Sequence, residues 1–315
     1  MPNTAPSRQS TDAVLMIRPA QFYPNAETAS NNVFQKTLEG VSPAELLRLA
    51  QAESDALAEA LARAGVNVCV MESRTADETP DALFPNNWFS THADGRIVLY
   101  PMYAANRRRE RREDVLDALH TRFGFVSRAR IDLTALEQRD VYLEGTGSLL
   151  LDRPAGVVYV CRSVRSHPEG IQAVAAQLGL TPVVFSAVDG DGFAIYHTNV
   201  MLSLGTDFAI VCLEAVADAA EREALQASLR ASGRELVVIS RAQMGEFAGN
   251  ALELLSRDST RLIAMSTRAW AAFTPGQQQR IAAHVKVVAV PIPVIETIGG
   301  GGVRCMLAEI FLPRA

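Results

Sequence analysis

The chain has 315 residues, of which 48% are hydrophobic and 21% charged, a balance typical of soluble globular proteins. Its net charge of −5 gives no argument for nucleic-acid binding, and its basic run RRRERR over 107–112 is interpreted as a solvated helix start. The sequence has no transmembrane-length apolar run, and its first residues lack a signal-peptide core. We therefore expect a cytoplasmic protein with a disordered tail over 1–13 and one domain over 14–315.

The predicted elements follow a regular order of strand, polar loop, strand and helix. The expected strands cover 14–17, 66–70, 97–100, 157–160, 183–185, 209–213, 236–239, 262–265, 287–290 and 306–311. The expected helices cover 168–178, 218–231 and 245–255, follow the capping sequences at Ser42 and Thr274, and include an arginine-rich one ending near 123. The long polar segment after Pro19 fits a lid or binding loop and a surface excursion equally well.

This order recurs about five times in units of roughly 50–60 residues, which is typical of a repeat architecture. Five such units suit a closed ring better than an open dinucleotide-binding sheet, and no GxGxxG sequence follows a strand. Because no change in composition marks a linker, we expect a single α/β domain.

Three of the four cysteines, Cys69, Cys161 and Cys212, lie inside apolar runs and are expected to be buried in strands. The absence of a CxxC pair argues against a zinc or thioredoxin-like site, and the spacing indicates no disulfide framework. The fourth, Cys305, follows four consecutive glycines over 299–302, where a ligand could approach the main chain closely. Taken alone, that stretch fits a structural cysteine behind a flexible turn at least as well.

Polar residues occur at three places where the strand pattern favours apolar ones. These residues are Asn86 and Asn87, Glu144 with Thr146 and Ser148, and His197 with Asn199. Burying an unpartnered polar group costs about 1–3 kcal/mol, so three such clusters need a common explanation. In a ring of repeats, each unit can present one such loop to a shared axis.

Together with Cys305, these clusters supply a nucleophile, a base and a carboxylate. Cys305 would attack a substrate, His197 would transfer protons, and Glu144 would pair with the histidine or hold a cationic group. The remaining histidines fit surface or helix positions; they are His92, His120, His167 and His284.

The segments LEGTGS, YHTN and GGGVRCM, in that order, resemble the guanidino-group-modifying or pentein superfamily. It includes arginine deiminases, dimethylarginine dimethylaminohydrolases and amidinotransferases. The sequence is most similar to bacterial citrulline-utilisation hydrolases, through the further segments MIRPAQF, FPNNWFSTH and YHTNVM. The resemblance spans Met16 to Phe311 and implies a single-domain α/β propeller with five-fold pseudosymmetry.

The resemblance also implies roles for individual residues. Cys305 corresponds to the nucleophile, His197 to the general acid and base, and Glu144 to its acidic partner. Arg165 resembles the arginine that binds the substrate α-carboxylate, a task that suits its fork of donors. The family needs no metal or organic cofactor, and the expected partner is a small amino-acid substrate. A homodimer is compatible with the sequence, which does not show one.

Two departures from the deiminases concern the substrate. Asn87, next to Asn86, and Asn199 stand where the deiminase motifs carry an aspartate. A carboxylate suits a cationic guanidinium, whereas an amide can donate a hydrogen bond to a neutral ureido oxygen. We therefore expect hydrolysis of citrulline to ornithine, ammonia and carbon dioxide through an S-carbamoyl intermediate, with Asn86, Asn87, Arg165 and Asn199 contacting the substrate.

Three alternatives remain open at this point. The protein could act on arginine or methylarginine as a deiminase or dimethylaminohydrolase. It could be an amidinotransferase, in which an amine replaces water as the acceptor. It could also be a non-catalytic propeller of the ribosome-binding kind, although such a protein has no reason to keep cysteine, histidine and glutamate at all three positions.

Overall fold

The computed structural model describes residues 8–38 and 40–315, whose strands form five sheets of three strands each. The strands are β1 (Ala13–Arg18), β2 (Asn67–Glu72), β3 (Phe89–Thr91), β4 (Arg96–Leu99), β5 (Ala129–Asp132), β6 (Leu149–Asp152), β7 (Val157–Cys161), β8 (Thr181–Phe185), β9 (Leu202–Leu204), β10 (Phe208–Val211), β11 (Glu235–Val238), β12 (Leu252–Leu255), β13 (Arg261–Ser266), β14 (Lys286–Val290) and β15 (Ala308–Glu309). The longer helices are α1 (Pro43–Arg63), α3 (Glu113–Thr121), α5 (Pro168–Leu178), α6 (Ala219–Ala231) and α9 (Pro275–His284). The shorter ones are α2 (Ala105–Arg108), α4 (Gly145–Ser148), α7 (Arg241–Gly245) and α8 (Thr267–Ala272). In the described part of the chain, no helix is both long and apolar enough to cross a membrane.

Every sheet has the same construction. A middle strand pairs antiparallel with one neighbour and parallel with the other; β4, for example, lies antiparallel to β3 and parallel to β5. A parallel partner needs a crossover connection, and the chain between each middle strand and its parallel partner contains a helix in all five sheets. The repeat predicted from the sequence is therefore confirmed.

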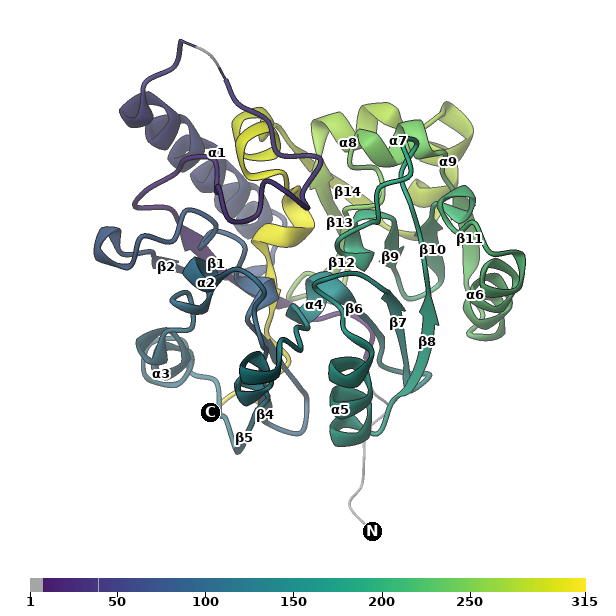
Figure 1. Cartoon of the computed structure of the whole chain (residues 1–315), viewed down its shortest axis with the longest axis horizontal. Coiled ribbons are helices and arrows are strands. Elements are labelled where there is room, and N and C mark those ends of the chain that lie inside the picture. Colours follow the sequence, from purple (N-terminus) through teal and green to yellow (C-terminus); the bar gives the residue numbers. More distant parts are fainter. Residues whose placement is uncertain (1–7, 39) are drawn as a thin grey trace.

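The first sheet closes the ring, because its antiparallel strand comes from the other end of the chain. β15 pairs with β1 through Val14 opposite Glu309 and Leu15 opposite Ala308. Figure 1 shows this last segment, in yellow, returning through the centre of the molecule to the first strand. The strand is shorter than the predicted 306–311, because the residues before it form a helical turn. These features confirm the predicted five-fold pseudosymmetric α/β propeller.

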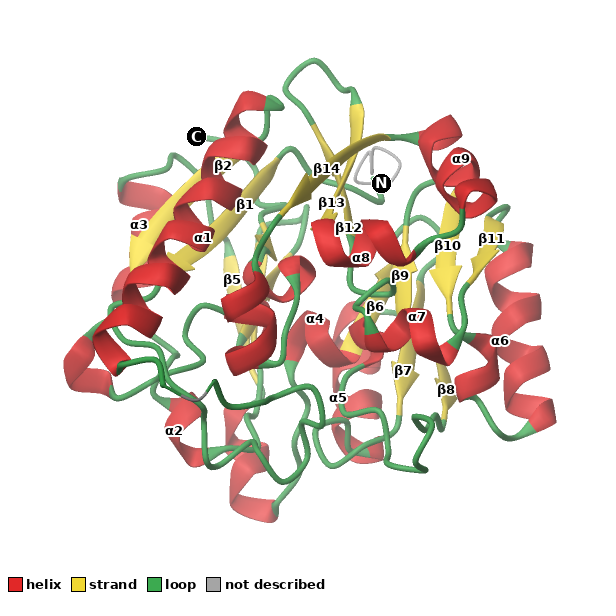
Figure 2. Ribbon diagram, turned by 90° about the horizontal axis from the view of Figure 1, so that it is seen from above, coloured by secondary structure: helices red, strands yellow, loops and turns green. Residues whose placement is uncertain are grey.

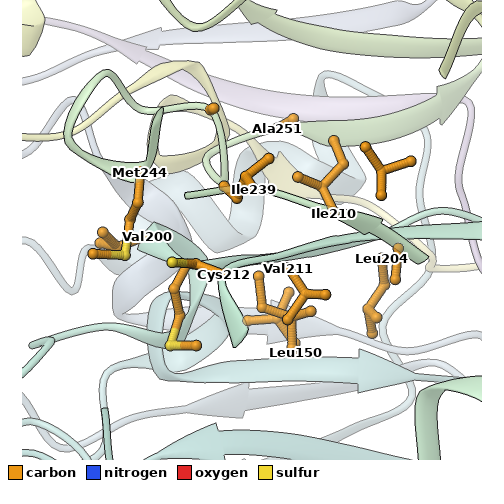
Figure 3. Close-up of a cluster of buried hydrophobic side chains, with 14 of the residues drawn as sticks. Leu150, Val200, Leu204, Ile210, Val211, Cys212, Ile239, Met244 and Ala251 are labelled. Atoms are coloured by element: carbon orange, nitrogen blue, oxygen red, sulfur yellow. The ribbon is translucent and has the colours of Figure 1, made fainter. Parts of the chain in front are cut away.

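The longer helices lie around the outside of the ring, and the strands lie between them and the centre (Figures 1 and 2). Neighbouring units share their helices: α1 packs on β1, β2 and β14, and α6 packs on β8 and β11. Buried apolar clusters fill the spaces between adjacent sheets. Figure 3 shows part of one cluster, with Cys212 among Leu150, Val211 and Val200. Cys69, Cys161 and Cys212 are free and buried in strands or beside them, as expected.

Helix starts follow the predicted capping chemistry. Thr274 and Gln277 form a complete capping box at the start of α9, with each side chain bonded to the other residue's backbone. Ser42 caps α1 by accepting from the Glu45 amide, but the Glu45 carboxylate binds Arg48 instead of completing the box.

Other predictions also differ from the structure. The segment 245–255, expected as a helix, contains the end of α7 followed by β12, whose four residues satisfy both strand and helix patterns. The expected tail over 1–13 is packed where it is described: Ser10 donates to Glu253 and Thr11 donates to the Ile310 carbonyl. Residues 1–7 of that tail lie outside the described residues.

The basic run over 107–112 is only partly solvated, in contrast to the prediction. Arg107 and Glu110 are 2% and 4% exposed and bind each other, because they lie on the same side of a helical turn that faces the ring.

Candidate active site

The polar clusters lie in short turns just before the antiparallel strands, rather than inside the strands as predicted. The turns are η2 (Pro85–Asn87), α4, η4 (Thr198–Val200), residues 246–251 and η7 (Val303–Met306), which precede β3, β6, β9, β12 and β15. Because all five sheets have the same construction, their turns meet at one end of the ring axis.

Glycines let neighbouring turns touch. A Cβ atom at Gly145 would lie 2.3 Å from the Asn86 carbonyl oxygen, and one at Gly249 would lie 2.3 Å from the Val200 carbonyl oxygen. A Cβ atom at Gly302 would lie 2.6 Å from Asn250 Oδ1. Side chains at these positions would push the turns apart, so the glycines around Cys305 serve close packing of the site.

Glu144 and His197 form a buried pair in the turns before β6 and β9. His197 Nε2 lies 2.8 Å from Glu144 Oε2, and the backbone amide of Tyr103 donates to Glu144 Oε1 at 3.1 Å. Since an ionised carboxylate only accepts, Nε2 carries the proton and Nδ1 is left with a lone pair. A Cβ atom at Gly147 would lie 2.8 Å from Nδ1, so this nitrogen packs closely against that glycine.

Two arginines set the electrostatics of this pair. Arg165 Nη1 lies 3.4 Å and Arg107 Nη1 3.8 Å from Glu144 Oε2. Although burial opposes ionisation, Arg165, His197 and Arg107 hold the pKa of Glu144 well below its usual range. Burial lowers the pKa of His197 to about 4, against the opposite effect of Glu144. The imidazole is therefore neutral at physiological pH and can accept a proton.

This neutral imidazole predicts a pH dependence of stability. The His197 pKa falls from 6.5 to about 4 on folding, so the native state binds fewer protons and its stability is complete above about pH 6.5. Stability falls as the pH drops from there toward 4, and His197 should account for a loss of about 2 kcal/mol between about pH 7.5 and about pH 5. Urea unfolding at both pH values should show a smaller loss of unfolding free energy at the lower pH for His197→Gln than for the wild type. His120→Gln, which removes an exposed imidazole, is the control, and equal losses in the wild type and His197→Gln would contradict the assignment.

Cys305 lies in η7 and is 4% exposed. Two amides donate to its sulfur: Asn250 Nδ2 at 3.3 Å and Asn199 Nδ2 at 3.5 Å. Asn250 is fixed in this orientation because its Oδ1 accepts from the Arg304 backbone amide at 3.1 Å. Burial raises the pKa of the Cys305 thiol, and the Asn250 donor acts in the opposite direction. The sulfur is therefore a neutral thiol, and the two amide donors are already in place to stabilise its anion.

Asn250 was missed by the sequence reasoning, because the segment 245–255 was taken for a helix. Its position just before the strand residues 252–255 repeats the placement of Asn87 before β3 and of Asn199 before β9. That repeat is the signal that could have identified it.

The predicted nucleophile, Cys305, lies against the turn that follows the predicted base, His197. Asn199, which contacts the Cys305 sulfur, follows His197 by two residues in the same turn. Among the described residues, no hydrogen bond joins Cys305 directly to His197 or Glu144.

Three asparagines carry buried polar atoms without a partner. In the described part of the chain, eight buried side-chain nitrogen and oxygen atoms lack a hydrogen bond, and four belong to these residues. They are both amide atoms of Asn86, Nδ2 of Asn87 and Oδ1 of Asn199. Because such atoms cost free energy when unpaired, their concentration beside Cys305 is typical of a site that binds a polar ligand.

Arg165, expected to hold a substrate carboxylate, is 2% exposed. Its Nε donates to Asn31 Oδ1 at 3.0 Å, Nη1 approaches Glu144, and its guanidinium lies 4.9 Å from the centre of the Tyr196 ring. Asn31 belongs to the long polar segment after Pro19. This segment also bonds to the glycine stretch, where Asn32 Nδ2 lies 3.4 Å from the carbonyl oxygens of Gly299 and Gly300. Of the two interpretations of this segment, these contacts favour a lid or binding loop and argue against a surface excursion.

Two further observations concern alternative sites. The described residues hold no group of three or more histidine, cysteine, aspartate or glutamate side chains placed to bind a metal. His92, expected at the surface, is 8% exposed; its Nε2 lies 3.0 Å from Ser90 Oγ, and burial lowers its pKa to about 3.

The chain is similar to known proteins both in sequence and in fold. The model of the family described as N,N dimethylarginine dimethylhydrolase, eukaryotic, matches residues 18–312. The substrate-bound N-terminal domain of a mutant of ArgZ, an arginine dihydrolase from cyanobacteria, is 18% identical with a TM-score of 0.71, over 95% of this chain and 99% of that one. No curated protein gives a significant match.

Two further solved structures share the fold at low sequence identity. Unliganded AgrE is 17% identical with a TM-score of 0.72, over 96% of this chain and 40% of that one. A dimethylarginine dimethylaminohydrolase adduct with S-methyl-L-thiocitrulline is 16% identical with a TM-score of 0.61, over 94% and 98% of the two chains. Since the family model covers nearly the whole sequence, the chain belongs to the N,N-dimethylarginine dimethylhydrolase family, within the guanidino-group-modifying or pentein superfamily.

Proposed function

We propose that this protein is a cysteine-dependent hydrolase of C–N bonds that cleaves the ureido group of citrulline. Cys305 is the nucleophile, His197 is the general acid and base, and Glu144 orients and supports His197. The observation that carries the proposal is the set of unpartnered amide atoms of Asn86, Asn87 and Asn199 beside a thiol that two amide donors contact.

The first half of the reaction forms a covalent intermediate. His197 Nδ1 takes the proton of the Cys305 thiol, and the sulfur attacks the ureido carbon. The tetrahedral intermediate then breaks one C–N bond, and His197 returns the proton to the departing nitrogen. The ureido carbon remains bonded to the Cys305 sulfur.

The second half releases that carbon. His197 accepts a proton from a water molecule, whose oxygen attacks the same carbon. The C–S bond breaks, and the thiol regains the proton from His197. The product of this step is a carbamic acid that still carries the second nitrogen, and its breakdown to an amine and carbon dioxide breaks the remaining C–N bond. The overall products are ornithine, ammonia and carbon dioxide.

The residue types around the sulfur support a neutral substrate group. Glu144 already binds His197, the Tyr103 amide and Arg165, which leaves its carboxylate fully occupied. Asn87 and Asn199 stand where deiminases carry carboxylates, and amides can pair with a ureido group, which has both a carbonyl oxygen and N–H donors. A cationic guanidinium offers donors only and would meet Arg107 and Arg165 without a new carboxylate.

Arginine or a methylated arginine is the second candidate substrate. The relatives favour it: ArgZ is described as an arginine dihydrolase, and AgrE has been solved with L-arginine. The chain covers 99% of the ArgZ N-terminal domain but 41% of full-length ArgZ, so any resemblance in activity concerns that domain.

A substrate panel tests the proposal. The protein would be incubated separately with citrulline, arginine, methylarginine and agmatine, while ammonia, ornithine and citrulline are followed over time. We expect ornithine and ammonia from citrulline, with a larger kcat/KM than for any other member of the panel. Formation of citrulline from arginine, without turnover of citrulline, would replace this proposal with a deiminase.

A further inference from the structure

The buried guanidinium of Arg107 has donors that the neighbouring ion pair with Glu110 does not use. Glu110 accepts from Nε at 2.8 Å and from Nη2 at 2.9 Å, which fixes the guanidinium plane. Nη1 donates to Asn87 Oδ1 at 2.9 Å. Arg107 is 2% exposed, so no water shell competes for these bonds.

This contact determines which way the Asn87 amide faces. With Oδ1 bound to Arg107, the NH2 group must lie on the opposite side. Turning the amide over would set its N–H groups against those of the guanidinium, which has no acceptor to offer. Asn87 therefore presents a donor, Nδ2, that is buried and finds no acceptor among the described residues.

The donor packs against the same glycine as the base. A Cβ atom at Gly147 would lie 2.3 Å from Asn87 Nδ2 and 2.8 Å from His197 Nδ1. A side chain at residue 147 would collide with both nitrogens, so the Asn87 donor and the imidazole lone pair both lie against this glycine and close to each other.

We propose that Arg107 is a positioning residue that determines specificity: it holds the Asn87 amide as a hydrogen-bond donor and so selects substrates with an acceptor at the reacting carbon. A ureido oxygen is such an acceptor, whereas a guanidinium has none. This inference rests on the proposed function. The proposal assigns one residue of the arginine-rich run, Arg107, a role in the site.

The test compares citrulline with arginine in matched variants. Arg107→Met is combined with Glu110→Gln, so that the Glu110 carboxylate is not left buried without its partner. Because a site built to bond a substrate group discriminates strongly against analogues that lack it, we expect the ratio of kcat/KM for citrulline to that for arginine to fall at least about tenfold. Arg109→Met is the control: it makes the same change in the same run, at a residue whose side chain is 50% exposed, and should leave the ratio unchanged.

Asn87→Asp provides a second route that keeps Arg107 and its contacts with Glu110 and Glu144. It replaces the Nδ2 donor with a carboxylate oxygen and should also lower the ratio at least about tenfold, mainly by raising kcat/KM for arginine. If the double variant does not fold, this variant decides the matter. A ratio that stays at the wild-type value in either folded variant would overturn the role of Arg107. A wild type that turns over arginine but not citrulline would instead reject the proposed function.

Discussion

Replacing Cys305 with serine should abolish turnover while leaving the fold intact. The exchange changes one atom in a turn whose hydrogen bonds involve the backbone and Asn250, so the melting temperature should change little. A serine hydroxyl is far less acidic than a thiol, and His197 cannot generate its anion at neutral pH. We expect kcat for citrulline to fall by about 10³-fold or more, in line with the loss of other catalytic nucleophiles.

Cys212→Ala is the matched control for this experiment. Cys212 is also free and buried, but it lies after β10 among the apolar side chains of the cluster in Figure 3. Its replacement should cost some stability through the lost volume and leave kcat unchanged. Activity that survives in Cys305→Ser would remove Cys305 from the proposed role.

The second large effect is expected for Glu144→Gln, which should damage activity and stability together. The substitution keeps the shape but leaves His197, Arg165 and Arg107 without their shared carboxylate. Removing one partner of a buried charge network costs about 3–5 kcal/mol, and a glutamine can no longer stabilise a protonated His197. We expect kcat to fall by about 10²-fold or more, and the free energy of unfolding to fall by about 3 kcal/mol.

Asp152→Asn separates these two effects. Asp152, the last residue of β6, forms a buried ion pair with Arg234, which directly precedes β11. The substitution should cost a comparable amount of stability in urea unfolding and leave kcat close to the wild-type value. Equal losses of kcat in Asp152→Asn and Glu144→Gln would show that destabilisation alone explains the effect.

The sequence predicted the repeat well because each unit carries local signals that do not depend on the rest of the chain. Strand patterns such as those of β7 and β13, and caps such as Thr274 with Gln277, are set by neighbouring residues. The resemblance supplied the order of the motifs and the ring. Where local signals conflict, as in the apolar segment 245–255, the prediction failed.

Burial of charged residues could not be predicted, because it depends on contacts between distant parts of the chain. Arg107 looks like any surface arginine in the sequence, and only the fold shows that it lies against Asn87 and Glu144. The same holds for Asn250, which reaches Cys305 across 55 positions. The polar residues of the site were recognisable by type, but their mutual hydrogen bonds were not.

The central claim is that the ureido carbon of citrulline becomes bonded to the Cys305 sulfur during turnover. The most direct measurement uses citrulline labelled at that carbon, acid quenching within the first turnover, and peptide mapping by mass spectrometry. The account predicts transient label on the peptide that contains Cys305, and none on the peptides that contain Cys69, Cys161 or Cys212. Ornithine formation without label on any cysteine would contradict it.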